Sequence, residues 1–242
     1  MKYSVIIPTL NEEKLLPELL RQLSDDDLNR KYDFEIIVSD GGSRDKTVSI
    51  ALEYADKVKV HNNSAAQNIA GGRNSGAKYA KGEIFVFING DVIFENVSGF
   101  FGFLEKNFAA NKFLAMTCKV KIFPHEETLL DRLFHYGYNS YFRLLNGMGL
   151  GMGRGECQVV KRNIFFKVGG YNEALAAGED FDLFRRVRRL GKILYTKEIC
   201  VFESPRRFRK LGYKGVTVSW VKNGFSVLFK NKSLSKEWEQ VR

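Results

Sequence analysis

The chain has 242 residues, 44% hydrophobic and 27% charged, an ordinary composition that excludes a disordered or fibrous protein. No run of about 18 apolar residues is present to span a membrane, and MKYSVIIPTL lacks the apolar core of a signal peptide. The three cysteines lie far apart without a CxxC spacing, which argues against a disulfide framework or a zinc site. Together these features predict a cytoplasmic protein.

Positive charge is concentrated in one segment. The chain carries 38 Lys and Arg against 28 Asp and Glu, a net charge of +10. Residues 185–214 hold eleven basic and two acidic residues, which is almost the whole excess. We expect this segment to meet an anion, such as a phosphate, a nucleic acid or an acidic membrane, unless it is only a solvated helix face.

The first half of the chain alternates predicted strands and helices. Strands are expected at residues 3–7, 34–39, 58–60 and 84–94. Helices are expected from about residue 12, with Asn11 as N-cap, and at about 46–55 and 71–80, with a polar connection at 24–33. Such alternation predicts an α/β, Rossmann-like fold, in which a mostly parallel central sheet carries helices on both faces.

The second half is less regular. Helices are expected at residues 98–110, 127–145, 163–168, 180–190 and 215–229, and strands at 114–123, 158–161, 193–195 and 200–203. Residues 146–155, NGMGLGMGRG, hold five glycines and predict a flexible loop, either a lid over a bound ligand at residues 147–155 or a simple connection. We see no repeat or linker, so the chain is expected to form a single domain over residues 1–242.

Two acidic residues follow apolar predicted strands. Asp91 interrupts the apolar run IFVFINGDVIF (residues 84–94), and Asp40 ends a second strand just before two glycines. Because parallel strands end along one sheet edge, where ligands bind, we expect the two carboxylates to share a cleft. Asp91 is then a candidate ligand for a hard divalent cation. The alternative for each residue is a turn in which the carboxylate accepts backbone hydrogen bonds.

Further candidates are an acidic helix start and three arginines. The sequence GEDFDL (residues 178–183) begins a helix whose dipole favours acids in any case and keeps Asp180 ionised, so that Asp180 is a candidate general base. Arg73 lies at a glycine-rich helix start, where free backbone N–H groups attract anions. Arg206 and Arg207 follow a predicted strand. Each arginine is a candidate phosphate ligand, or else simply exposed.

Several common motifs are missing from the sequence. Neither GxGxxG nor the P-loop GxxxxGK[ST] is present, which argues against a dinucleotide cofactor and against ATPase chemistry. The three histidines, His61, His125 and His135, show no spacing for a zinc site or a catalytic triad, and we assign them no role.

Four segments, in this order, resemble the motifs of the family 2 glycosyltransferases over about residues 3–210. They are SVIIPTLNEEKLLPELLRQL, EIIVSDGGSRDKT, GGRNSGAKYAKGEIFVFINGD and VGGYNEALAAGEDFDLFRRVRRLGK. The resemblance implies a GT-A fold and transfer, with inversion, of a sugar from a UDP- or GDP-sugar to an acceptor hydroxyl. It also implies a nucleotide-sugar-binding half at about 1–97 and an acceptor-binding half at about 98–242, the latter ending in an amphipathic helix.

The resemblance also implies roles for individual residues. Those expected at the nucleotide are Pro8, Thr9, Glu12, Asp40, Gly41, Arg73, Asn89 and Gly90. The resemblance further places Mg²⁺ or Mn²⁺ on Asp91 and makes Asp180 the general base. Glu179, Arg206 and Arg207 are expected on the diphosphate and acceptor side.

Two positions depart from the family pattern. The first residue of the usual Asp-x-Asp is Asn89, whose neutral side chain either lowers metal affinity or binds the ribose or a metal-bound water. The usual Asp-Asp-Gly-Ser lacks one acid in Ser39-Asp40-Gly41-Gly42-Ser43. One alternative is therefore a catalytically weak or inactive sugar-nucleotide-binding relative. A basic nucleic-acid-binding module is another, argued only from the net charge, and no nucleic acid partner is expected.

The acceptor is expected to be a glycan or a lipid-linked molecule. Residues 215–229, with Trp220, Phe225 and Phe229, either contact an anionic membrane surface or pack on the domain as a terminal helix. A membrane contact would suit a lipid-linked acceptor and a membrane-peripheral location.

Overall fold

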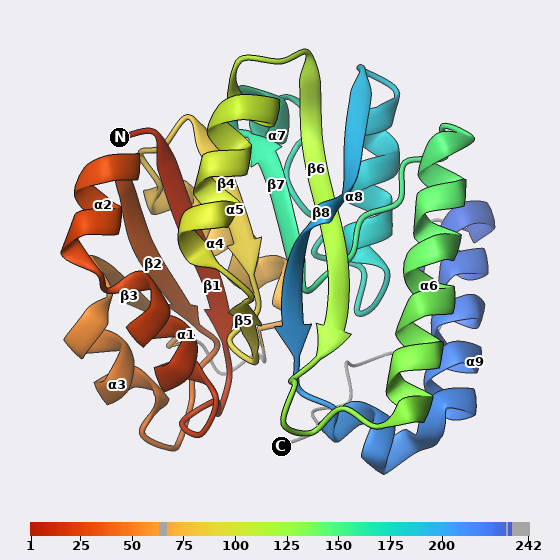
Figure 1. Cartoon of the computed structure of the whole chain (residues 1–242), viewed down its shortest axis with the longest axis horizontal. Coiled ribbons are helices and arrows are strands. Elements are labelled where there is room, and N and C mark those ends of the chain that lie inside the picture. The colour runs from red at the N-terminus through yellow and green to blue at the C-terminus, as the bar shows by residue number, and fades with distance from the viewer. Residues whose placement is uncertain (63–66, 231, 234–242) are drawn as a thin grey trace.

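The computed structural model describes residues 1–62, 67–230 and 232–233, and the strands among them form one eight-stranded sheet (Figure 1). The strands are β1 (Tyr3–Thr9), β2 (Phe34–Asp40), β3 (Lys57–Val60), β4 (Ile84–Ile88), β5 (Val92–Phe94), β6 (Phe113–Ile122), β7 (Cys157–Lys161) and β8 (Lys192–Glu203). Their order across the sheet is β3-β2-β1-β4-β7-β6-β8-β5. The first four are parallel, as are β6 and β8, whereas β7 and β5 run antiparallel to their neighbours. The predicted α/β class is confirmed.

Helices cover both faces of the sheet. They are α1 (Leu16–Leu23), α2 (Asp26–Tyr32), α3 (Thr47–Tyr54), α4 (Ile69–Tyr79), α5 (Val97–Phe103), α6 (Leu129–Gly147), α7 (Arg162–Lys167), α8 (Glu179–Arg188) and α9 (Arg206–Lys230), with a π-helix at Leu104–Ala109. Alternate side chains of β1 point to opposite faces. Val5 and Ile7 therefore pack beneath α1, α3 and α5, whereas Ile6 packs beneath α4, α7 and α8.

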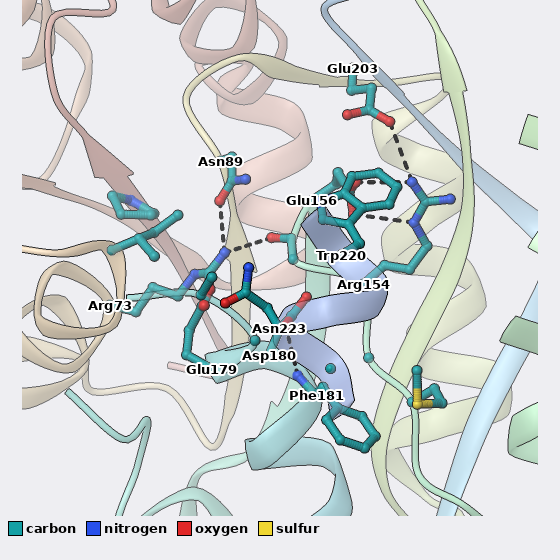
Figure 2. Close-up of a pocket in the computed structure, with 18 of the residues that line it drawn as sticks. Arg73, Asn89, Arg154, Glu156, Glu179, Asp180, Phe181, Glu203, Trp220 and Asn223 are labelled. Carbon is teal, nitrogen blue, oxygen red and sulfur yellow. Dashed lines mark hydrogen bonds and ion pairs between the residues drawn. The ribbon is translucent and has the colours of Figure 1, made fainter. Parts of the chain in front are cut away.

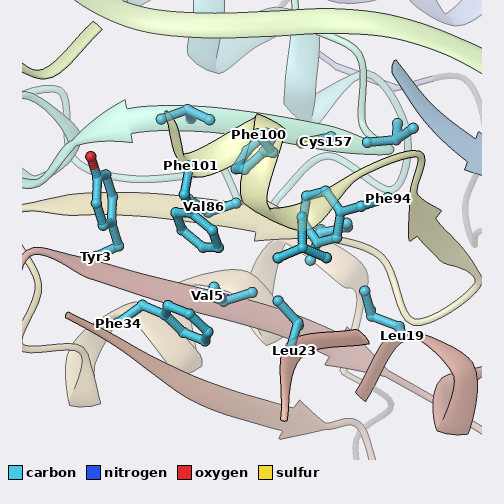
Figure 3. Packing of buried hydrophobic residues seen from close by; sticks show 14 of the residues in the cluster. Tyr3, Val5, Leu19, Leu23, Phe34, Val86, Phe94, Phe100, Phe101 and Cys157 are labelled. Carbon is cyan, nitrogen blue, oxygen red and sulfur yellow. The ribbon is translucent and has the colours of Figure 1, made fainter. Parts of the chain in front are cut away.

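Aromatic rings fill the larger of these two cores. Phe101 of α5 stacks on Phe34 of β2 with the ring centroids 4.8 Å apart, and its centroid lies 5.3 Å from that of Tyr3 (Figure 3). All three side chains are buried. Close packing of this kind gives β1, β2 and β4 a rigid setting, so their carboxyl ends hold fixed positions relative to one another.

The first helix begins later than predicted, and Asn11 does not cap it. Asn11 adopts a left-handed backbone conformation with a φ of +54°. Its side-chain oxygen accepts a hydrogen bond from the backbone N–H of Arg44 at 2.9 Å. Helix α1 instead starts at Leu16, with Pro17 in its first turn. The intervening turn keeps Glu12 next to the end of β1, where the Glu12 N–H donates to Thr47 Oγ1 at 2.7 Å.

Three other boundaries also differ from the sequence prediction. Residues 24–33, predicted as a polar connection, contain α2, because the side chain of Asp25 accepts two backbone N–H groups and caps that helix. The run 84–94 is two strands, β4 and β5, separated by a turn. Residues 193–195 and 200–203, predicted as two strands, both belong to β8.

We predict that Gly82→Ala destabilises the fold by about 1–3 kcal/mol, the usual effect of overpacking a core. A methyl group on Gly82 would lie 2.5 Å from the carbonyl carbon of Tyr3 and 2.6 Å from the backbone N of Ser4, and neither backbone atom can move aside easily. Gly137→Ala is the matched control. Its methyl group would meet nothing within 4 Å, and alanine favours the helix by about 1 kcal/mol. Urea unfolding measures both, and equal effects would contradict the prediction.

Candidate functional site

One large cavity lies at the carboxyl ends of β1, β2, β4 and β8, with a volume of about 1120 Å³. The residues before β7 reach the same edge because β7 runs antiparallel to β4 and pairs Cys157 with Ile88. Twelve of the thirteen predicted site residues line this cavity, namely Pro8, Thr9, Glu12, Gly41, Arg73, Asn89, Gly90, Asp91, Glu179, Asp180, Arg206 and Arg207. Asp40 is the exception.

Asp40 is fully buried behind the cavity wall and organises a turn. Its carboxylate accepts hydrogen bonds from the backbone N–H groups of Gly42 and Ser43, at 2.9 and 2.7 Å, and from Thr9 Oγ1 at 3.0 Å. These contacts match the alternative considered for Asp40, namely a turn in which the carboxylate accepts backbone hydrogen bonds. The turn holds Gly41 at the cavity, where the Gly41 N–H donates to the carbonyl of Thr9 at 2.8 Å.

Asp91 lies in the turn between β4 and β5 and forms an ion pair with the first residue of α9. Arg206 Nη2 is 2.9 Å from Asp91 Oδ2 and 2.6 Å from Glu12 Oε1, so one guanidinium bridges two carboxylates. Gly90 allows the turn after β4 to lie close to the end of β1. A methyl group on Gly90 would lie 3.2 Å from the side chain of Thr9 and 3.5 Å from that of Glu12. The β4 end, the β1 end and the start of α9 therefore meet at one cationic centre.

Arg73 is a buried cation that joins three segments (Figure 2). Its Nη1 donates to Glu179 Oε1 at 2.8 Å, at the start of α8. Its Nη2 donates to Asn89 Oδ1 at 2.9 Å and to the carbonyl of Gly155 at 2.7 Å. The guanidinium also lies over the ring of Tyr171, with its carbon 5.0 Å from the ring centroid. Arg73 therefore fixes three segments relative to one another, namely the β4 turn, the glycine-rich segment 146–155 (the glycine loop) and the start of α8.

The helix that carries Arg73 begins earlier than predicted, and its glycines offer no free N–H groups for an anion. Asn68 is the N-cap of α4, and its side chain accepts the N–H of Gly71 at 2.8 Å. The N–H of Gly72 donates to the carbonyl of Asn68 at 3.0 Å. The expectation of a backbone anion site at these two glycines is therefore wrong.

Asp180 lies in the first turn of α8 and faces the cavity. Burial and the neighbouring Glu179 carboxylate raise the pKa of Asp180 to about 7, although Arg73 opposes this shift. The helix dipole was expected to keep Asp180 ionised at neutral pH. Desolvation opposes the effect of the dipole here and favours the protonated form of the carboxyl group. Such a pKa suits a group that takes up a proton near neutral pH.

A second charged cluster borders the cavity and was missed from the sequence. Arg154 is buried, and its Nη2 lies 2.9 Å from Glu156 Oε1 and 3.3 Å from Glu203 Oε1 (Figure 2). Burial and Glu156 raise the pKa of Glu203 well above its usual range. Beside them, burial and then the charge of Arg154 lower the pKa of His135 to about 4, so that ring is neutral. The sequence signal that could have identified this cluster is the presence of charged residues directly before β7 and at the end of β8.

Aromatic side chains of α6 and α9 form the opposite wall of the cavity. Tyr138 and Trp220 pack with ring centroids 4.8 Å apart, and the guanidinium of Arg154 lies over the ring of Tyr138 at 5.3 Å. The glycine loop closes this side and is packed against α8. A methyl group on Gly153 would lie 2.5 Å from the ring of Phe184, so the loop approaches that helix closely.

Comparison with known proteins gives a consistent picture. Residues 4–166 match the family model described as Glycosyl transferase family 2. Over 231 residues the chain is 27% identical to 4,4'-diaponeurosporenoate glycosyltransferase of Staphylococcus haemolyticus, which covers 91% of this chain and 60% of that protein.

Two solved structures are similar in fold. The mannosyltransferase PcManGT from Pyrobaculum calidifontis, in complex with GDP-Man and Mn²⁺, superposes with a TM-score of 0.73 at 19% identity, over 95% of this chain and 64% of that chain. Staphylococcus aureus TarS 1-349, in complex with UDP-GlcNAc, superposes with a TM-score of 0.62 at 20% identity, over 84% of this chain and 58% of that chain. This chain thus spans less than two thirds of the length of each of these relatives.

Within the described parts of the chain, none of the helices combines the length and the apolar character needed to cross a bilayer. The cytoplasmic and membrane-peripheral locations stay predictions.

We predict that Arg73→Met costs about 3–5 kcal/mol of folding stability, because it leaves the buried Glu179 carboxylate unpaired. Chemical denaturation measures the loss. Arg21→Met is the control. Its ion pair with Glu18 is exposed, and such pairs contribute at most about 1 kcal/mol. If Arg73→Met were as stable as the parent protein and only weakened nucleotide binding, Arg73 would serve the ligand and not the scaffold.

Proposed function

The chain belongs to glycosyl transferase family 2, and from this membership we propose that it transfers a sugar, with inversion, from a nucleotide-diphosphate sugar to an acceptor hydroxyl. The observation that carries the proposal is the shared cavity. A carboxyl group with a pKa of about 7, Asp180, faces the same space as Asp91 and two arginines at the carboxyl edge of the sheet. Transfer of a sugar needs both a proton acceptor and a cationic site for the leaving diphosphate.

The donor is proposed to be a UDP- or GDP-sugar. Proteins of similar fold have been crystallised with GDP-Man and with UDP-GlcNAc, which supports this class of donor. In the present chain Pro8, Gly41 and Gly90 line the part of the cavity next to β1, β2 and β4. Arg206 and Arg207 line the same cavity and supply positive charge for the diphosphate.

The proposed reaction is a single displacement at the anomeric carbon. Asp180, as the carboxylate, takes the proton of the acceptor hydroxyl while that oxygen forms a bond to the anomeric carbon. The bond from this carbon to the phosphate oxygen breaks, and its electron pair leaves with the nucleoside diphosphate. Attack from the face opposite the leaving group inverts the configuration. Arg206 and Arg207 stabilise the charge that develops on the leaving group.

The oxygens around Asp91 fit a hard divalent cation that takes most of its ligands from the substrate. The carboxylates of Asp91 and Glu12 both contact the guanidinium of Arg206. The side-chain oxygen of Asn89 instead accepts a hydrogen bond from Arg73. No group of three or more His, Cys, Asp or Glu side chains forms a metal cage within the described ranges. Mg²⁺ is commonly held by one or two carboxylates together with phosphate oxygens and water. We therefore place Mg²⁺ or Mn²⁺ on Asp91, where it would neutralise diphosphate charge.

The acceptor is proposed to be a glycan or a lipid-linked molecule that enters from the side of α6, α9 and the glycine loop. Tyr138, Phe142 and Trp220 line that side of the cavity. Such rings offer broad apolar faces to a ligand, with polar groups at their edges.

We predict that UDP or GDP raises the melting temperature in the presence of Mn²⁺. A ligand at about 100 times its Kd stabilises by about 2.7 kcal/mol, which corresponds to roughly 5–11 °C for a protein of this size. Asp91→Asn should lose the part of the shift that depends on Mn²⁺, whereas Asp27→Asn, in the exposed α2, should keep it. No shift with any nucleoside diphosphate would contradict the proposed donor.

We predict that Asp180→Asn lowers turnover by about 10²–10⁴-fold, because the amide cannot take the proton. Nucleotide binding, measured by calorimetry, should be nearly unchanged. In the parent protein kcat/KM should rise tenfold per pH unit below about pH 7 and level off above it, since only the ionised form of Asp180 is a base. Release of nucleoside diphosphate measures both effects, and full activity of the variant would exclude Asp180 as the base.

A further inference from the structure

Helix α6 exposes its apolar side to solvent. Its outward residues are between 48% and 76% exposed and include Leu129, Leu130, Leu133, Tyr136, Tyr141 and Leu144. Met148, directly after the helix, is 66% exposed. A surface helix normally turns such residues toward the core, and a contiguous exposed apolar patch usually marks an interaction site.

The inward side of the same helix carries buried polar residues beside its aromatic rings, and the hydrogen bonds of these polar residues fix the orientation of the helix. Asp131 is buried at the first turn, where it accepts from the backbone of Thr128 and pairs with Arg209 of α9. Asn139 is buried further along the same side of the helix. Its side-chain amide accepts a hydrogen bond from the N–H of Val120 on β6 at 3.1 Å and donates one to the carbonyl of Val120 at 2.8 Å. Rolling the helix to bury its leucines would break these bonds, so the apolar face stays outward.

Most of the charges around this face are basic, although Arg132 forms an ion pair with Glu127 at 3.1 Å. Of the three Asp, Glu, Lys and Arg residues in α6, Asp131 is buried and paired, whereas Arg132 and Arg143 are exposed. Helix α9 lies beside α6 (Figure 1) and packs against it through rings such as Phe134 and Phe208, whose centroids are 5.4 Å apart. The sequence of α9, residues 206–230, contains no acidic residue, and its exposed cations include Lys210, Lys214 and Lys222.

We propose that the outward face of α6, flanked by these basic residues, is a docking surface for an anionic lipid bilayer. Leucine and tyrosine side chains with flanking Lys and Arg are the composition of helices that lie in a membrane interface. A bilayer with anionic lipids complements this excess of positive charge, which comes mainly from α9. A second copy of this chain would instead bring two basic surfaces together, which costs free energy.

The docking surface continues into the candidate site. Tyr141 and Met148 belong to the exposed face and also line the cavity, as does Val221 of α9, which is 50% exposed. An acceptor anchored in the bilayer would therefore reach the cavity along this face. This last step rests on the proposed function, whereas the docking itself does not.

The membrane surface proposed here differs from the one expected at residues 215–229. That segment lies within α9, which is broken at Gly212, where φ is +67° and ψ is 158°. Trp220 of this segment turns toward Tyr138 and the cavity. The side chains of Phe225 and Phe229 lie outside the described residues. The apolar contact therefore moves from α9 to α6, and α9 contributes charge.

Sedimentation of the full chain with vesicles tests the proposal. Vesicles of phosphatidylcholine with phosphatidylglycerol should bind the protein, and pure phosphatidylcholine vesicles should bind it more weakly. Leu133→Glu and Leu144→Glu should each lower the partition coefficient by about tenfold or more, since each removes a leucine that would be buried in the bilayer and adds a charge that anionic lipids repel. Leu52→Glu, on α3, is the matched control at 66% exposure and should bind as the parent does.

Two further measurements keep the outcomes distinct. Asp180→Asn should bind vesicles normally, so failure of the proposed chemistry would leave this result standing. Thermal melting checks that the Leu→Glu variants are folded. The proposal is overturned if the parent protein does not bind phosphatidylglycerol vesicles, or if Leu52→Glu loses as much binding as Leu133→Glu. A dimer in gel filtration that Leu133→Glu dissociates, without vesicle binding, would assign the face to a second copy and equally overturn it.

Discussion

The arrangement of the candidate site depends on one buried cation. Arg73, on α4, is fully buried, and burying a charge is costly unless hydrogen-bonding or charged partners surround it. Its partners come from the β4 turn, the glycine loop and α8. Pairing of β7 with β4 already brings the first two segments together, and the guanidinium ties the start of α8 to them. The requirement to satisfy one guanidinium therefore helps to set the positions of Asn89 and Glu179, and with them the neighbouring Asp91 and Asp180. Through these positions the cation acts on the proposed chemistry.

Much of the architecture follows from local patterns in the sequence. Apolar runs alternating with helical segments predict the α/β class, and the implied GT-A fold is supported by similar solved structures. Because the parallel strands end at one edge, twelve predicted residues meet at one cavity. Strand direction in the second half could not be predicted, since β7 and β5 are antiparallel only through long-range pairing. The polar segment at 24–33 also misled, because one capping side chain outweighs a composition typical of a loop.

Local sequence patterns do not predict which side chains contact one another in the site. Asn89 reads as a departure from a metal motif, yet its oxygen accepts from Arg73, sixteen residues away. The pKa of Asp180 depends on burial, which a helix start in a sequence does not reveal. For a related reason, the sequence does not show which face of α6 points outward. Aromatic and apolar residues lie on both sides of that helix, and only the polar anchors Asp131 and Asn139 decide which side faces the protein.

The bridge from Arg206 to Glu12 and Asp91 would make binding of the proposed metal ion an exchange reaction. Two carboxylates and one guanidinium carry a net charge of −1, so these acids already have a tethered counterion. A metal ion that binds Asp91 competes with that counterion for the same oxygens. Its apparent affinity therefore includes the cost of displacing Arg206 and the gain when the released guanidinium finds another anion. The proposed diphosphate would supply that anion, so metal and nucleotide are expected to bind with positive linkage, each lowering the free-energy cost of the other.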